Sequence, residues 1–277
     1  MFFHPPISDA FEKNGHLVFK TFRNKKSKGY YFKMLTFEGY LRYLMSTDFI
    51  LSVILSSLGF IGYYFSMNSE GLFKRFYPDH NGVVKGTDTW VVYQRICGVA
   101  FLGIIPALIV ILFFNSSFYE LGINFKNPLL TFGCTIGLLV LVIFMNSKNG
   151  GTKENLVVYP QIRSFPWAKK DFITNSWSWI AYLIAYEFLF RGILFFGTVY
   201  FIGLTEAVIL NAAIYALVHI PKGMKETLGA IPLGIVLCII SYHTGNIWTA
   251  LLVHVGLALS NDYFSHKAQV RLLNESK

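Results

Sequence analysis

Two oppositely charged side chains interrupt one of the most apolar parts of this sequence. Glu187 and Arg191 lie four residues apart in the segment YEFLFRG, residues 186–192. Residues at this spacing share one face of a helix, and a carboxylate that precedes a guanidinium is the favourable order. A buried charge is costly unless it is paired and hydrogen-bonded. The spacing therefore predicts an ion pair on one helix face and makes this face a candidate functional site.

Two histidines lie within or at the end of the apolar runs that follow: His219 ends one run, and His254 lies inside the last one. A carboxylate can act as a general base toward water, and a neutral imidazole can share the proton or donate to an oxyanion. The site could therefore use Glu187, His219 and His254 to activate water. The same three side chains could instead hold a divalent metal such as zinc, although no His-Glu-x-x-His helix motif is present.

The elements that must position these side chains are membrane helices. Hydrophobic residues make up 54% of the 277 residues, and only 14% are charged, whereas about a quarter of an average soluble domain is charged. A membrane β-barrel would show alternating segments of about ten residues instead of long apolar runs. The sequence predicts an all-α polytopic membrane protein, a bundle of about seven to eight transmembrane helices. Runs long enough to span a bilayer lie at about 49–67, 91–114, 128–145, 176–199, 203–219, 227–243 and 246–264.

The candidate site residues all fall in one part of the chain. The first three spans carry little polar chemistry, and the basic N-terminal segment can place an interfacial helix over 30–45 or remain a solvated tail. The predicted division is an N-terminal segment (1–47), three spans (48–145), an amphipathic loop (146–175), a four-helix catalytic core (176–264) and a polar tail (265–277).

Helix geometry predicts how deep the candidate side chains lie. At a rise of about 1.5 Å per residue, Glu187 lies about 16 Å into its span, and His254 lies about 12 Å from the opposite surface. In a hydrocarbon core about 30 Å thick these depths are similar. We therefore expect Glu187, His254 and His219 to converge on one cavity. Arg95, near the start of the second predicted span, can extend its charge to the interface.

The formal net charge of +9 indicates which partners the chain favours. Its basic residues flank the predicted spans, which favours contact with membrane lipids over nucleic acid. The three cysteines lie in apolar runs without a Cys-x-x-Cys pair, so they are expected to be small buried side chains.

Three motifs in the C-terminal half resemble those of the CPBP intramembrane proteases. This family comprises CAAX prenyl endopeptidases and bacteriocin-processing or immunity homologues, and it is also called the Abi family. Its motifs are Glu-Glu-x-x-x-Arg, Phe-x-x-x-His and His-x-x-x-Asn. The corresponding segments here are Glu-x-x-x-Arg-Gly at 187–192, YALVH at 215–219 and TGNIWTALLVH at 244–254. The resemblance covers about residues 176–262.

The resemblance implies a helical membrane bundle that cleaves a peptide or protein substrate in a bacterial inner membrane. It implies that a glutamate and His219 activate water, that His254 stabilises the oxyanion, and that Arg191 supports them. With the residues present here, the predicted catalytic set is Glu187, His219 and His254, with Arg191 in support.

Two positions depart from the family motifs. Tyr186 stands where the family has its first glutamate, and Ala258 stands where it has asparagine. A phenol with an ordinary pKa of about 10 is a poor base at neutral pH. Asn261 lies about 10.5 Å further along the helix axis than His254, and no motif supports Asp262. Two hypotheses stay open: an endopeptidase that uses Glu187 as its base, and a non-catalytic membrane scaffold or immunity-type protein.

Overall fold

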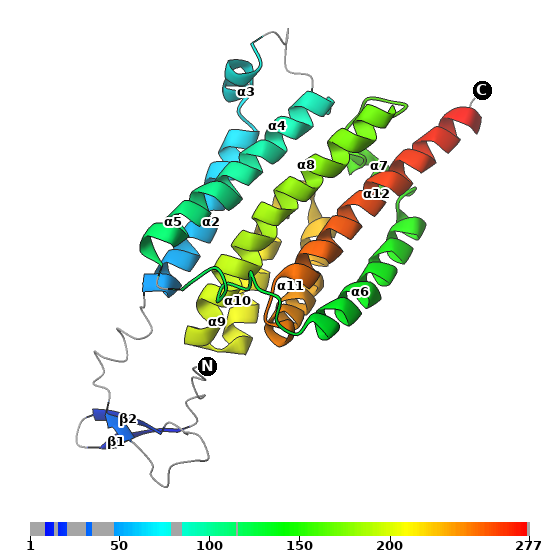
Figure 1. The fold of residues 1–277 in the computed structure, drawn as a ribbon. Coiled ribbons are helices and arrows are strands. Elements are labelled where there is room, and N and C mark those ends of the chain that lie inside the picture. Colours follow the sequence, from blue (N-terminus) through cyan, green and yellow to red (C-terminus); the bar gives the residue numbers. More distant parts are fainter. Residues whose placement is uncertain are drawn as a thin grey trace.

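The computed structural model shows a helical bundle with a small sheet near the N-terminus (Figure 1). The residues that it describes are 9–13, 16–20, 32–34, 47–78, 85–114 and 116–275. The strands β1 (Asp9–Lys13), β2 (His16–Lys20) and β3 (Phe32–Met34) form an antiparallel sheet in the order β1-β2-β3. Within the range 30–45, where an interfacial helix was one of two predictions, the structure has the strand β3 at Phe32–Met34 instead, and the rest of that range lies outside the described residues.

All other regular elements in the described residues are helices, which confirms the predicted helical membrane bundle. The first half contains α2 (Thr47–Met67), α3 (Glu70–Phe76), α4 (Asp88–Gly98), η1 (Val99–Ile104), α5 (Ile105–Phe113) and α6 (Pro128–Asn149). The second half contains α7 (Lys153–Val158), α8 (Lys169–Glu187), η2 (Phe188–Phe196), α9 (Gly197–Ile202), α10 (Leu204–Leu217), η3 (Ile220–Lys222), α11 (Met224–Thr244) and α12 (Trp248–Glu275). The segments η1 and η2 are π-helical, and η3 is a 3₁₀ turn.

Five helices in the described residues are long and apolar enough to cross a membrane: Thr47–Met67, Asp88–Phe113, Pro128–Asn149, Lys169–Ile202 and Met224–Thr244. They coincide with five of the seven predicted spans, so the chain is an integral membrane protein. The other two predicted spans are helical as well. Neither is among the five candidate spans. The helix α10 has only 14 residues, and α12 has 28 residues that include buried polar side chains such as Asn261 and Asp262.

The two segments on either side of the predicted core also contain helices. Within 146–175, α6 continues to Asn149 and α7 forms a short helix before α8 begins. Beyond residue 264, α12 continues to Glu275. The backbone N–H of Trp167 donates to Nε2 of His266 at 3.2 Å, and the two rings stack. The loop before α8 is therefore attached to the C-terminal end of α12.

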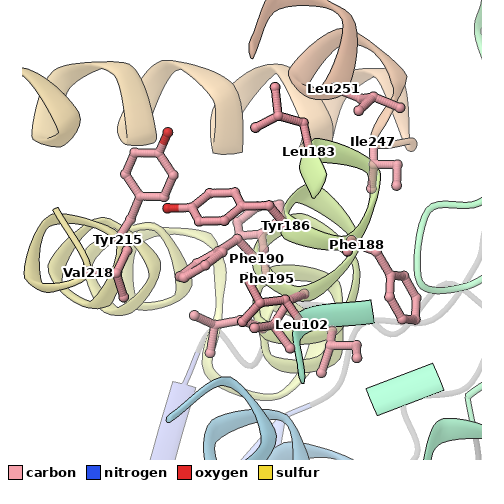
Figure 2. Close-up of a cluster of buried hydrophobic side chains, with 14 of the residues drawn as sticks. Leu102, Leu183, Tyr186, Phe188, Phe190, Phe195, Tyr215, Val218, Ile247 and Leu251 are labelled. Atoms are coloured by element: carbon pink, nitrogen blue, oxygen red, sulfur yellow. The ribbon is translucent and has the colours of Figure 1, made fainter. Parts of the chain in front are cut away.

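The segment η2 lies at the centre of the hydrophobic core. All nine of its residues are buried. Figure 2 labels three of them, Phe188, Phe190 and Phe195, in the hydrophobic cluster that also contains Leu102 of η1, Tyr215 of α10 and Leu251 of α12. Asn211 of α10 donates from Nδ2 to the carbonyl of Phe190 at 2.6 Å. A π-helix is rare and often occurs at functional sites. Here Glu187, the last residue of α8, directly precedes the π-helical segment, and Arg191 lies within it.

Candidate active site

Glu187 and His254 meet inside the bundle, as their predicted depths indicated. Glu187 is fully buried at the end of α8. Its Oε1 lies 2.6 Å from Nδ1 of His254 on α12. An ionised carboxylate only accepts hydrogen bonds, so the Nδ1–H group of His254 donates. This bond connects the fourth predicted span to the seventh.

Arg191 lies on the other side of the Glu187 carboxylate. Its Nη1 is 3.3 Å from Oε2 of Glu187, and both side chains are completely shielded from solvent. The guanidinium carbon lies 4.4 Å from the centre of the Tyr215 ring, a favourable position for a cation over an aromatic face. The predicted ion pair is therefore present, and its opposite charges offset part of the cost of burial.

His219 follows α10 and reaches the same region by another route. Its Nδ1 lies 2.7 Å from the backbone carbonyl of Tyr215. A carbonyl oxygen can only accept, so this nitrogen carries the proton and Nε2 keeps a lone pair. The same reasoning applies to His254, whose Nδ1–H is used by Glu187. Both imidazoles therefore have Nε2 available as a hydrogen-bond acceptor.

A cavity of about 50 Å³ lies between these two histidines. In this measure one water molecule needs about 10–15 Å³, so the cavity can hold water or a small group. Its lining residues come from α2, α8, the connection between α10 and α11, and α12. They are Phe60, Tyr63, Tyr64, Met67, Trp179, Tyr182, Tyr186, Val218, His219, Pro221, Lys222 and His254. Glu187 and Arg191 are not among them, so the ion pair lies behind His254.

Tyr186 lines the cavity and lies near both histidines. Its ring centre is 5.4 Å from that of His254 and 6.4 Å from that of His219. Its hydroxyl is buried and has no hydrogen-bond partner among the described residues. Figure 2 shows the Tyr186 ring packed beside Tyr215 and Phe190. The substitution that departs from the family motif thus faces the cavity directly.

The remaining α12 positions considered in the sequence, Ala258, Asn261 and Asp262, do not line the cavity. Ala258, one turn beyond His254, is buried and belongs to the apolar core. The backbone carbonyl of Asn261 accepts from Ser265. Oδ2 of Asp262 accepts from Nε1 of Trp179 at 2.7 Å. Asp262 therefore holds a residue of the cavity wall without reaching the cavity itself.

The prediction for Arg95 was wrong, because its side chain is buried with an exposure of 3%. Its guanidinium donates to side chains of Asn175, Ser178 and Gln161 at 2.7–3.1 Å. It also stacks over the Trp179 ring, 4.0 Å from the ring centre. Interior partners on α8 thus replace the water that an interfacial arginine would contact. The sequence feature that could have indicated this burial is the pair of polar residues Asn175 and Ser178 on one face of α8, next to Trp179.

The residues present do not fit the metal alternative. In the part of the chain that the structure describes, no group of three His, Cys, Asp or Glu side chains is placed to hold a metal ion. Nδ1 of His254 and Oε1 of Glu187 face each other at hydrogen-bond distance. These two donor atoms bind each other instead of a common ion.

A comparison with known proteins finds a family that matches the part of the chain containing this site. Residues 172–260 match the family model described as type II CAAX prenyl endopeptidase Rce1-like. The matched segment runs from α8 into α12 and includes Glu187, Arg191, His219 and His254. A comparison with curated proteins and with solved structures finds no match to the chain. Residues 172–260 are therefore similar to the Rce1-like type II CAAX prenyl endopeptidases, and this match agrees with the resemblance that the three motifs carry.

Proposed function

We propose that this protein is an intramembrane endopeptidase in which water between His219 and His254 attacks a peptide bond. The observation that carries the proposal is the 2.6 Å hydrogen bond from His254 to Glu187. It leaves Nε2 of His254 free at a cavity that His219 also lines. Acceptor nitrogens at a water-sized cavity inside a membrane bundle are what general-base hydrolysis requires.

In this proposal His254 is the general base. The carboxylate of Glu187 fixes the tautomer of the imidazole and stabilises the imidazolium that forms when Nε2 takes a proton from water. Arg191 balances the negative charge of Glu187 while the imidazole is neutral. His219 accepts a hydrogen bond from the second proton of the same water and so orients it.

Glu187 takes a different role from the one that the motifs favoured. Its two carboxylate oxygens face His254 and Arg191, and it is not among the cavity-lining residues. We therefore propose Glu187 as a positioning residue that acts through His254. In this assignment His254 activates water, whereas the resemblance alone assigned it to the oxyanion.

The family description suggests the substrate to test first. We propose a peptide or protein substrate whose scissile bond enters the cavity from the membrane, and we take a prenylated C-terminal peptide as the first probe. The motif resemblance favours a bacterial inner membrane as the location. A lipid environment follows from the five apolar helices.

The test uses the full chain reconstituted in lipid vesicles. A farnesylated peptide with a CAAX sequence and its unprenylated counterpart are incubated with it over a range of pH, and products are identified by mass spectrometry. The parent should cleave at least one peptide. Glu187→Gln, His219→Ala and His254→Ala should each lower the rate at least about 100-fold, because general-base catalysis contributes about 10²–10⁴.

The matched control is His243→Ala, which replaces an exposed histidine at the end of α11 that does not line the cavity. Its rate should equal that of the parent. Cleavage that persists in all three site variants would overturn the site assignment.

A second candidate function is a non-catalytic membrane scaffold or immunity-type protein. Two observations favour it: Tyr186 and Ala258 replace family motif residues, and the cavity of about 50 Å³ is smaller than the 300–1,000 Å³ of a typical ligand pocket. If the folded parent protein cleaves neither peptide at any pH, the peptidase proposal is rejected and the scaffold function is favoured.

A further inference from the structure

We propose that Tyr186 is a further catalytic residue, whose phenolic O–H donates a hydrogen bond to the oxyanion formed at the scissile carbonyl. This inference rests on the proposed peptidase function. It starts from the hydrogen-bonding capacity of the cavity wall. An oxyanion requires donors placed where its charge develops.

Neither histidine supplies such a donor in its neutral form. The Nδ1–H groups of His219 and His254 are occupied by the Tyr215 carbonyl and the Glu187 carboxylate. Each ring therefore offers the cavity only a lone pair on Nε2. Ala258, at the position of the motif asparagine, has no donor side chain. Two bases face the cavity, and the oxyanion still needs a donor.

The other donors that line the cavity are engaged or lie toward its exposed side. Nε1 of Trp179 donates to Asp262. Tyr63 and Tyr182 interact with each other, and their ring centres lie 5.6 Å apart. The ammonium group of Lys222 lies 3.9 Å from Glu226, in a pair that is about one-third exposed.

Tyr186 has the free donor. Its hydroxyl is buried without a partner among the described residues, whereas most buried polar side-chain atoms in proteins have one. Its ring contacts both imidazole rings, and it lines the cavity. Tyr215 is near both imidazoles as well, but its ring faces Arg191 and it is not a lining residue.

The step that follows is balanced in atoms and charge. Nε2 of His254 takes a proton from water as the water oxygen bonds to the carbonyl carbon. The carbonyl π pair moves to oxygen, and the Tyr186 O–H donates to that oxyanion while keeping its proton. The imidazolium of His254 then protonates the amide nitrogen, the C–N bond breaks, and an acid and an amine are released.

The test is Tyr186→Phe in the vesicle assay, because this change removes one oxygen and keeps the ring. Loss of one oxyanion donor lowers kcat by about 10²–10³, so kcat should fall by about this factor with KM nearly unchanged. The control is Tyr263→Phe, an exposed tyrosine on α12 that does not line the cavity, which should leave kcat within about threefold of the parent.

A second variant covers the case in which Tyr186→Phe does not fold. Replacing Tyr186 by 3,5-difluorotyrosine keeps the hydroxyl but lets it lose its proton at a lower pH. The alkaline limb of kcat should then move to lower pH, a change that a packing role would not produce.

Full activity of Tyr186→Phe, or an unmoved pH profile in the fluorinated protein, would overturn the role of Tyr186. The assignment of His254 and Glu187 would then stand on its own variants. A parent without cleavage removes the peptidase function and this role together.

Discussion

Glu187 and Arg191 explain each other's presence inside an apolar bundle. Both are fully buried, and the carboxylate lies between the guanidinium and His254. A buried pair of this kind contributes little net stability compared with apolar side chains, but removing one partner leaves an uncompensated charge. The position of the pair therefore agrees with a role in holding the orientation and tautomer of His254.

Glu187→Gln should therefore lower stability as well as activity. It leaves the Arg191 charge buried without a counter-charge, which typically costs about 3–5 kcal/mol. Thermal unfolding of the purified protein in detergent measures the loss. The double variant Glu187→Gln with Arg191→Met should recover much of it without recovering activity. A single variant as stable as the parent would show that the buried Arg191 does not need Glu187 as its counter-charge.

At the scale of the elements, close approach between α4 and α8 sets one wall of the cavity. A Cβ on Gly98 would lie 2.3 Å from Cδ2 of Tyr182, and Tyr182 lines the cavity. Gly103 meets Ala185 in the same way, at 2.7 Å. The glycines on this helix allow a contact that a larger residue would separate.

Gly98→Ala should push Tyr182 into the cavity and destabilise the bundle by about 1–3 kcal/mol, the usual cost of overpacking. The matched control is Gly137→Ala on α6, where a Cβ would meet nothing within 4 Å. That change should be neutral or slightly stabilising, because alanine is the better helix former. Melting temperatures and cleavage rates of the two variants provide the measurement. Equal behaviour would contradict the packing argument.

The elements and part of the site could be predicted from the sequence, because both follow from periodicity and length. Apolar runs located the helices, and helix rise placed Glu187 and His254 at one depth. The π-helical form of η2 has no comparable sequence signature, since it depends on contacts such as Asn211 with the Phe190 carbonyl. Arg95 was misplaced because its partners on α8 are distant in sequence.

At the scale of the whole molecule, the N-terminal half completes the site. The family match covers residues 172–260 only, yet α2 supplies Phe60, Tyr63, Tyr64 and Met67 to the cavity wall. Arg95 of α4 lies over the ring of Trp179, and Asp262 of α12 accepts a hydrogen bond from its Nε1. The cavity therefore depends on helices on both sides of the matched segment.

Arg95→Ala should destabilise the whole bundle. It removes hydrogen bonds of a charged group to Asn175 and Ser178, which typically contribute about 1.5–3 kcal/mol each. It also takes away a buried positive charge that offsets the negative charge of Asp262. Adding Asp262→Asn should restore part of that loss. A double-mutant cycle on thermal unfolding measures the coupling. Strictly additive effects would show that the two residues act independently.

The shortness of α10 has a consequence for the surrounding lipid. Its 14 residues extend only about 21 Å, against a hydrocarbon thickness of about 30 Å. His219 and the cavity lie at its C-terminal end. Hydrophobic mismatch of this size thins or dimples a bilayer locally. The headgroups would then dip toward His219, and the acyl-chain length of the host membrane would govern how easily water reaches the two imidazoles.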